Sequence, residues 1–457
     1  MKILLIGDNP NLVGGVVNYT RPLAEELTKK GHEVYYFCSG SFNKKYNLLL
    51  KPYIKESKKD GYTVFELINP PTYAFNYDNL ERDIENDKLD RIFENLIKKI
   101  NPDVVHIHEM IGLSVSTIKI IKKYNIPLYR TIHIYWHLCP KRVMIDSNGA
   151  LCEGPQDINK CSKCIKQISY KNDKKKIILK NMIDKNKWIS VKIKKIKNKK
   201  ERNSNINVNK TVIKNTNIDI KYIDLLRYRL NENVDLLNNY FDKVICVSND
   251  VKNTLIRYGV KSDKLLVQHI GSTIAKNQTT RVKETKEKIV FANIGGVNHY
   301  KGSEVLLKSF NNVDKSKYEL KVFGWYDEKY VNKIMNECDI NVEFKGAYKQ
   351  SDLMELLKDV DIMILPSICK DTAPQTIFES FSCGIPIIAS NAGGFPDFIE
   401  NGVNGLLFEQ ANIKELKKCI NLILKDNSLI SRYRSNIKKL KTIEQNADEL
   451  INIYKMI

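Results

Sequence analysis

Apolar residues along this chain follow two different periods. Short apolar runs alternate with longer segments in which every third or fourth residue is apolar, which is the pattern of β-strands alternating with amphipathic helices. At the start of the chain it predicts a strand at 2–6, a loop at 8–15, a helix at 16–30 that Gly31 closes, and a second strand at 33–37. The first residues therefore predict a βαβ unit.

The same alternation continues through both halves of the chain. The further predicted strands are 104–107, 128–132 and 243–247 in the first half, and 289–294, 319–323, 341–344, 361–365 and 386–389 in the second. Strands that alternate with helices form parallel sheets with helices on both faces. We therefore expect an α/β protein with two Rossmann-like, doubly wound domains that face a cleft, and 457 residues are enough for two such cores.

Breaks in this pattern mark the domain boundaries. The charged segment 279–288 (TTRVKETKEK) predicts a linker, which places an N-terminal domain at 1–280 and a C-terminal domain at 281–440. A loop-rich and then basic insertion, about 139–225, interrupts the first domain. The last segment, 441–457, has apolar residues at helical spacing, so we expect an amphipathic helix that covers another surface.

The formal charge of +21 is unevenly spread. Residues 166–202 hold fifteen Lys or Arg and three Asp or Glu, a net +12, with Ile residues near helical spacing and Trp188 beside them. This stretch is either a solvated insertion or a basic amphipathic helix that lies on an anionic membrane surface. The opening residues, MKILLIGD, predict a strand and not an export signal, and no apolar run is long enough to span a bilayer. We therefore expect a cytoplasmic protein with reduced cysteines, peripheral on the inner face of the cell membrane if the basic stretch binds there.

The segment 371–394, DTAPQTIFESFSCGIPIIASNAGG, contains two acids at a spacing that indicates a ligand site. Asp371 lies in a loop, and Glu379 lies on the inner face of a helix that starts near Gln375, whose free N–H groups attract an anion. Such a site suits a diphosphate with a sugar at each end. The alternative is an ordinary αβ unit with surface acids.

This segment resembles the paired-acid motif of glycosyltransferase family 4, retaining enzymes with the GT-B fold that use nucleotide sugars. The resemblance implies that Glu379 holds the ribose hydroxyls and that Asp371, where the family usually has Glu, contacts the transferred sugar. It also implies that the C-terminal helix crosses back onto the N-terminal domain. The residues that the resemblance adds to the donor site are Ala373, Pro374, Gln375 and Thr376.

The loop GGVNHYKGS, 295–303, predicts a phosphate site, because Lys301 stands beside a helix N-terminus. Gly295 and Gly296 open this loop, and Gly296 stands where the resembled family usually has Arg. His299 either adds a hydrogen bond or charge to the site, or is structural. The Walker and dinucleotide-binding patterns are absent, which weighs against an NTPase and a nicotinamide-dependent dehydrogenase.

The first domain contributes glycines and histidines. Gly14 and Gly15 either allow a ligand to approach the backbone or form a plain tight turn. The run TIHIYWHLCP resembles a family segment whose His contacts the donor sugar, which implies that role for His133, unless it is a core histidine. We expect His106 and His108 to point to opposite faces of a strand, to be structural, and to leave Glu109 at the rim of the cleft.

Cys139, Cys152, Cys161 and Cys164 form a second constellation, of which the last two are a C-x2-C pair. In a reduced compartment four thiols favour a tetrahedral structural Zn site, with disulfides, an iron–sulfur cluster or unlinked thiols as alternatives. A subset of the resembled family carries the same cysteine pattern directly after the TIH segment.

Together these features predict a retaining glycosyltransferase without a catalytic metal, in which Lys301 and helix N–H groups stabilise the departing diphosphate. We expect a UDP- or GDP-sugar donor, a glycan or lipid-linked acceptor in surface polysaccharide synthesis, and no nucleic-acid partner. Two other classes stay open: an inactive family member that acts as a membrane partner, and a basic zinc-containing nucleic-acid-binding protein.

Overall fold

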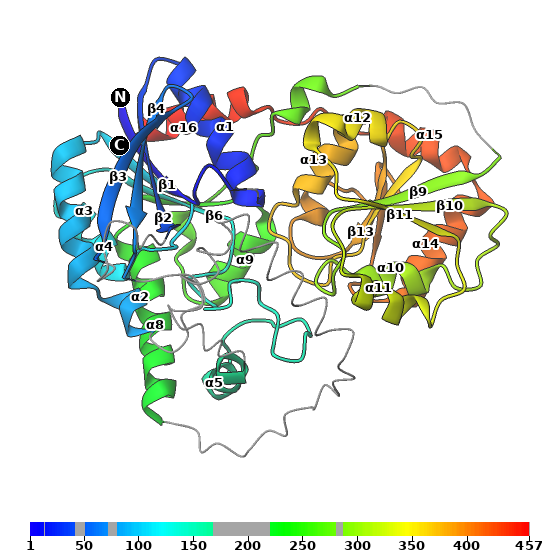
Figure 1. The fold of residues 1–457 in the computed structure, drawn as a ribbon, viewed down its shortest axis with the longest axis horizontal. Helices are drawn as coiled ribbons and strands as arrows, with labels where there is room; N and C mark the ends of the chain where they lie inside the picture. The colour runs from blue at the N-terminus through cyan, green and yellow to red at the C-terminus, as the bar shows by residue number, and fades with distance from the viewer. Residues whose placement is uncertain (13, 42–50, 72–79, 168–219, 280–286, 457) are drawn as a thin grey trace, which may run out of the picture.

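The computed structural model describes residues 1–12, 14–41, 51–71, 80–167, 220–279 and 287–456. The basic stretch of 166–202 lies almost entirely outside these residues, as does most of the predicted linker. Figure 1 shows two α/β lobes side by side. We call the lobe built on the first sheet the N-terminal lobe and the other the C-terminal lobe.

The N-terminal lobe is built on an eight-stranded sheet with the order β3-β4-β2-β1-β5-β6-β7-β8. All neighbouring pairs are parallel except the β3–β4 hairpin. The strands are β1 (Lys2–Gly7), β2 (Glu33–Ser41), β3 (Tyr53–Lys59), β4 (Tyr62–Ile68), β5 (Val104–Ile107), β6 (Leu128–Ile132), β7 (Lys243–Cys246) and β8 (Leu265–Val267). The helices are α1 (Gly15–Lys29), α2 (Glu81–Ile84), α3 (Asp87–Ile100), α4 (Val115–Lys122), α5 (Ile158–Gln167), α8 (Ile220–Asn239) and α9 (Asn249–Arg257).

The C-terminal lobe is built on a six-stranded, wholly parallel sheet with the order β11-β10-β9-β12-β13-β14. Its strands are β9 (Ile289–Ile294), β10 (Tyr318–Phe323), β11 (Val342–Gly346), β12 (Ile362–Leu365), β13 (Ile387–Ser390) and β14 (Gly405–Phe408). Its helices are α10 (Ser303–Ser309), α11 (Glu328–Met335), α12 (Leu353–Leu356), α13 (Gln375–Ser382), α14 (Ile413–Lys425) and α15 (Ser428–Ser435).

Two hydrophobic cores cover opposite faces of this second sheet. Val290, Ala292 and Met363 belong to a core that continues through the junction into the N-terminal lobe. Phe291 and Ile364, one residue away along the same strands, belong to the other core. Alternate residues of a strand point to opposite faces, so both faces of the sheet are buried, as in parallel sheets generally.

The last helix, α16 (Ile443–Tyr454), lies against α1 of the N-terminal lobe, as the red ribbon in Figure 1 shows. It begins with a capping box formed by Thr442 and Gln445, which satisfies N–H groups of its first turn. Tyr19 of α1 donates a hydrogen bond of 2.7 Å to Asn446, and Tyr129 of β6 donates one of 3.1 Å to the carbonyl of Ile453. The predicted return of this helix to the N-terminal domain is confirmed.

No helix within the described ranges is long and apolar enough to cross a membrane.

Candidate active site

Lys301 and Asp371 are joined at the carboxyl end of the second sheet. Lys301 lies in the loop after β9, and its Nζ is 2.9 and 2.8 Å from the two carboxylate oxygens of Asp371, in the loop after β12. Ser367 donates a further hydrogen bond of 2.6 Å to the same carboxylate. Burial is the largest influence and opposes the charge on Lys301, but Asp371 and Cys369 together outweigh it, so the pKa of the lysine is raised. The predicted phosphate cation and the predicted sugar-binding acid therefore form one ion pair.

Glu379 lies on α13 and is 7% exposed. Tyr348, which follows β11, donates a hydrogen bond of 3.4 Å to its Oε2. Burial raises the pKa of Glu379 to about 7, although the Tyr348 hydrogen bond acts in the opposite direction. Near neutral pH this carboxyl is therefore partly protonated, which makes its charge sensitive to anything that binds beside it.

The start of α13, which follows Asp371 closely along the chain, presents free backbone N–H groups. Pro374 is the N-cap and has no side-chain hydrogen bond to the first turn, which contains Gln375 and Thr376. Pro374 also accepts a hydrogen bond at its carbonyl from Ile377. Ala373, just before the N-cap, packs against the core that runs through the junction of the lobes.

Close backbone packing shapes the loop after β9. A Cβ on Gly302, whose φ is +73°, would lie 1.7 Å from the carbonyl oxygen of Pro366, so the loops after β9 and β12 touch through their backbones. Gly295 has φ +120°, a conformation that favours glycine. The carbonyl oxygen of Gly296 accepts a hydrogen bond of 3.3 Å from the side-chain amide of Asn298, and a Cβ on Gly296 would lie 3.1 Å from that amide nitrogen.

His299 of the same loop points across to the N-terminal lobe. Its Nε2 lies 2.8 Å from the carbonyl oxygen of Gly149, in the cysteine-containing segment. A carbonyl oxygen only accepts, so the histidine donates from this nitrogen. Of the two roles predicted for His299, the structure gives a direct contact for the structural one.

His133 comes from the other lobe and lies where the lobes meet. It follows β6, is 7% exposed, and its carbonyl oxygen accepts a hydrogen bond of 2.6 Å from Thr372 of the Asp371 loop. Burial and then the charge of Arg130 lower the pKa of His133 to about 3, so its ring is neutral. The space beside Gly14 and Gly15 is open, with nothing within 4 Å of a Cβ on either residue.

The prediction that His106 and His108 point to opposite faces is wrong. Their ring centroids are 4.1 Å apart, because residues two apart on an extended chain share a face. Glu109 is buried at 2% exposure instead of lying at a rim, and burial raises its pKa.

The four cysteines lie in one neighbourhood. Burial, followed by the proximity of Cys139, Cys152 and Cys164, raises the pKa of Cys161 to about 12. Lys141 Nζ lies 3.9 Å from the Cys164 sulfur and also donates to two backbone carbonyls. Nowhere in the described ranges are three or more His, Cys, Asp or Glu side chains arranged to hold a metal ion. The Zn site stays a prediction, since the donor set fits but the side chains are not gathered as ligands.

The residues 145–153 of this segment join the two lobes, and we call them the clasp. Ile145, 1% exposed, belongs to the core of the C-terminal lobe that contains Phe291 and Ile364. It also pairs with Leu151 through an isolated antiparallel bridge. Glu153 lies 2.7 Å from Arg257 of its own lobe and 3.4 Å from Lys370 of the other. The clasp thus contacts the loops that carry both Lys301 and Asp371.

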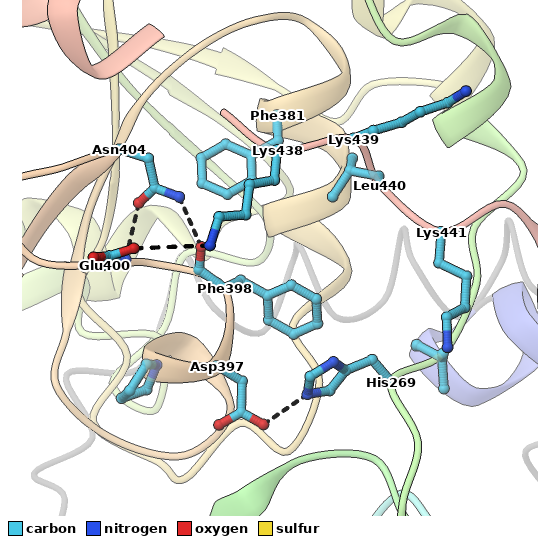
Figure 2. A pocket seen from close by; sticks show the side chains of 12 residues that line it. His269, Phe381, Asp397, Phe398, Glu400, Asn404, Lys438, Lys439, Leu440 and Lys441 are labelled. Atoms are coloured by element: carbon cyan, nitrogen blue, oxygen red, sulfur yellow. Dashed lines mark hydrogen bonds and ion pairs between the residues drawn. The ribbon is translucent and has the colours of Figure 1, made fainter. Parts of the chain in front are cut away.

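A pocket of 440 Å³ lies at another part of the junction, shown in Figure 2. His269 of the N-terminal lobe lies 2.8 Å from Asp397 of the C-terminal lobe, and Lys438 pairs with Glu400 across the pocket. None of the predicted donor-site residues lines it, so this pocket is separate from the candidate active site.

Sequence reasoning missed Tyr348, Ser367 and Thr372. Ser367 and Tyr348 follow predicted strands closely, so their place at a carboxyl end was a usable signal. Thr372 acts through a contact with a residue 239 positions away, which no local pattern could show.

Comparison with known families gives two matches. Residues 13–151 match the model described as Glycosyltransferase Family 4, and residues 275–440 match the model described as Glycosyl transferases group 1.

Among curated relatives, an uncharacterized glycosyltransferase of Methanocaldococcus jannaschii is 25% identical over 226 residues, 47% of this chain and 58% of that protein. The N,N'-diacetylbacillosaminyl-diphospho-undecaprenol alpha-1,3-N-acetylgalactosaminyltransferase of Campylobacter jejuni is 26% identical over 225 residues, 45% of this chain and 57% of that protein. The match thus spans somewhat more than half the length of these two relatives.

Among solved structures, Anabaena HepE in complex with UDP superposes with a TM-score of 0.61 and 14% identity over 99% of this chain and 100% of that chain. Sucrose-phosphate synthase from Thermosynechococcus elongatus gives a TM-score of 0.64 and 16% identity over 100% and 98%. At such identities the likeness is one of fold, and the predicted GT-B fold is confirmed.

Proposed function

We propose that this GT-B protein, which carries a matched glycosyltransferase domain in each lobe, transfers a sugar from a nucleotide sugar with retention of configuration. The observation that carries the proposal is the Lys301–Asp371 pair beside the start of α13, with His133 of the other lobe bonded to the same loop. Open α/β sheets bind ligands at this end of their strands.

Lys301 would stabilise the departing diphosphate. A diphosphate entering beside α13 offers the lysine a second anionic partner, and the N–H groups at the start of the helix favour the same negative charge. Each preorganised donor aimed at developing charge lowers the activation barrier by about 3 kcal/mol. As Lys301 turns to the phosphates, the Asp371 carboxylate becomes free to accept hydrogen bonds from hydroxyls of the transferred sugar.

Glu379 would accept hydrogen bonds from the ribose hydroxyls. The ionised carboxylate accepts at both of its oxygens, whereas protonation turns one of them into an O–H donor, and the buried carboxyl has a pKa of about 7. Retention would follow from attack by the acceptor on the face that the nucleotide leaves, with a phosphate oxygen taking the acceptor proton.

UDP- or GDP-sugars are the proposed donors, and a glycan or lipid-linked sugar is the proposed acceptor. The UDP-bound neighbour supports the donor class, and the undecaprenol-linked acceptor in the name of the Campylobacter relative supports the acceptor class. We place the domain limits at 1–280, 281–440 and 441–457, and the protein in the cytoplasm, peripheral on the inner membrane face through its basic stretch.

Calorimetry against UDP, GDP, ADP and CMP sugars tests the proposal. We expect one nucleotide class to bind and its sugar to be transferred or slowly hydrolysed. If Glu379→Ala bound the nucleotide sugar as tightly as the unchanged protein, Glu379 would not be part of the donor site. Absence of binding by every sugar nucleotide would overturn the proposed function.

A structural Zn ion at the four cysteines is a further part of the proposal. Protein purified under reducing conditions should contain close to one equivalent of Zn, lost on changing Cys161 and Cys164 together to Ser. Metal analysis that finds no Zn, in protein whose ten cysteines all titrate as free thiols, would show that these four residues are unlinked cysteines.

A further inference from the structure

Three buried histidines line up at the carboxyl end of β5 and β6. Both ring nitrogens of His106 have partners, the hydroxyls of Tyr454 and Thr131. His108 Nδ1 lies 3.2 Å from His133 Nε2. His108 is 0% exposed, and its Nε2 has no partner among the described residues.

None of these rings is charged near neutral pH. Burial first, and then the neighbouring histidines and Arg130, lower the pKa of His108, and burial and Arg130 do the same for His133. The ring of Tyr19 packs against the rings of His108 and His133, with centroid distances of 5.7 and 5.3 Å. A neutral imidazole carries one N–H, so the contact between His108 and His133 allows two arrangements.

In the first arrangement His108 Nδ1–H donates to His133 Nε2, and His133 carries its proton on Nδ1. In the second, His133 Nε2–H donates to His108 Nδ1, and His108 then holds a proton on Nε2. The second arrangement leaves a buried N–H without an acceptor, and the first leaves only a lone pair without a donor. Buried N–H groups without partners are the rarer of the two in proteins.

The remaining nitrogen of His133, Nδ1, makes no hydrogen bond with the described residues and is not among the buried atoms without a partner. It is therefore the ring nitrogen that solvent or a ligand reaches, at the junction where Thr372 holds the His133 carbonyl.

We propose that His108 is a positioning residue that holds His133 in the tautomer with its proton on Nδ1, so that His133 offers a neutral N–H donor to a hydroxyl oxygen of the donor sugar. This inference rests on the proposed function for the identity of the ligand, but the tautomer itself does not depend on it. A neutral N–H group can donate a hydrogen bond to an uncharged sugar hydroxyl. A charged imidazolium would instead place a further positive charge near the sugar, where no negative charge needs to be stabilised.

Long-range ¹H–¹⁵N spectra of the imidazoles test the tautomer directly in the full chain, which has seven histidines. We expect His133, assigned through loss of its signals in His133→Gln, to show the Nδ1–H pattern. His108→Phe should mix the two tautomers and lower kcat/KM about tenfold. His108→Asn, whose side-chain amide can donate from nearly the same place, should restore the Nδ1–H pattern of His133 and the kcat/KM value.

His106→Gln is the matched control, because it removes a buried histidine of the same row that does not contact His133. It should leave the His133 pattern unchanged. An Nε2–H pattern for His133 in the unchanged protein would overturn the inference, whether or not any variant folds. So would a folded His108→Phe protein in which the pattern is unaltered. Sugar-nucleotide binding, measured separately, shows whether the proposed function stands.

Discussion

Within the described part of the chain the Lys301 ammonium pairs with Asp371, and the proposed ligand would supply a second anionic partner. The Lys301 ammonium contacts both oxygens of Asp371, so these two opposite charges balance each other in the ligand-free protein. A diphosphate would disturb that balance and leave Asp371 in need of donors, which sugar hydroxyls supply. The pair therefore links binding of the phosphates to binding of the sugar.

Lys301→Ala should lower transfer by roughly a hundredfold, because developing charge on the leaving diphosphate loses a fixed cation. Steady-state transfer rates measure the effect. Lys308→Ala is a matched control, since Lys308 is also paired with carboxylates, those of Glu304 and Glu337, but lies in the last turn of α10, at the other end of the helix from the Lys301 loop. Similar losses in both variants would show that Lys301 acts only through general stability.

The raised pKa of Glu379 makes the ligand-free protein less stable at higher pH. Its folded pKa of about 7 lies above the ordinary value of 4.5, so the folded state holds the proton more tightly. The stabilisation is complete below about pH 4.5 and is lost as the pH rises to about 7, a difference of about 3 kcal/mol. Glu379→Gln cannot ionise and should be more stable than the unchanged protein at pH 8 but not at pH 4.5.

Chemical unfolding at both pH values measures this difference. Nucleotide affinity of the unchanged protein should rise between pH 6 and 8, as the carboxylate forms. Equal stability of the two proteins at pH 8 would mean that Glu379 ionises freely in the folded state.

Among the elements, the clasp depends on one glycine. Gly149 has φ +83°, and a Cβ there would lie 2.9 Å from the Nε2 of His299. The substitution therefore combines backbone strain with the loss of a contact between the lobes.

Gly149→Ala should destabilise the protein by more than the cost of about 1 kcal/mol that the left-handed conformation alone imposes. Gly31→Ala is the control, because Gly31 has φ +85° and nothing within 4 Å of a Cβ. Denaturant unfolding of both variants compares them. Equal losses would mean that the contact of Gly149 with His299 adds nothing.

Local pattern was sufficient for most elements. Strands β5, β6 and β9 begin and end where the sequence predicts, since each is a short, fully buried run of mostly apolar residues. The β3–β4 hairpin was missed, because β3 is mostly exposed and rich in Lys, although Asp60–Gly61 between the strands is a strong hairpin signal. The opposite-face reading of His106 and His108 failed because the strand period was misapplied.

The site was less predictable than the elements. The acids, Lys301 and His133 were found by their motifs, but the pairing of Lys301 with Asp371 joins loops 70 residues apart. The clasp contact of Gly149 with His299 spans 150 residues. Such contacts depend on how the two lobes dock, which no local period records.

For the molecule as a whole, α16 ties the last residues to the first lobe. Leu450 is fully buried against that lobe, so Leu450→Ala should cost about 2 to 5 kcal/mol. Leu422→Ala in α14 is the control, because Leu422 is 44% exposed. Denaturant unfolding measures both, and a loss at Leu450 no larger than that at Leu422 would show that α16 is only loosely attached.

The position of α16 also bears on how the chain is made. The ribosome produces β8 at 265–267 and must then add the whole second sheet before it reaches 443–454. At about 5 to 20 residues per second this interval is on the order of ten seconds. During this interval the nascent first sheet has every strand that the structure describes but lacks the helix that covers α1, so apolar surface stays accessible to chaperones until residues 443–454 have been made.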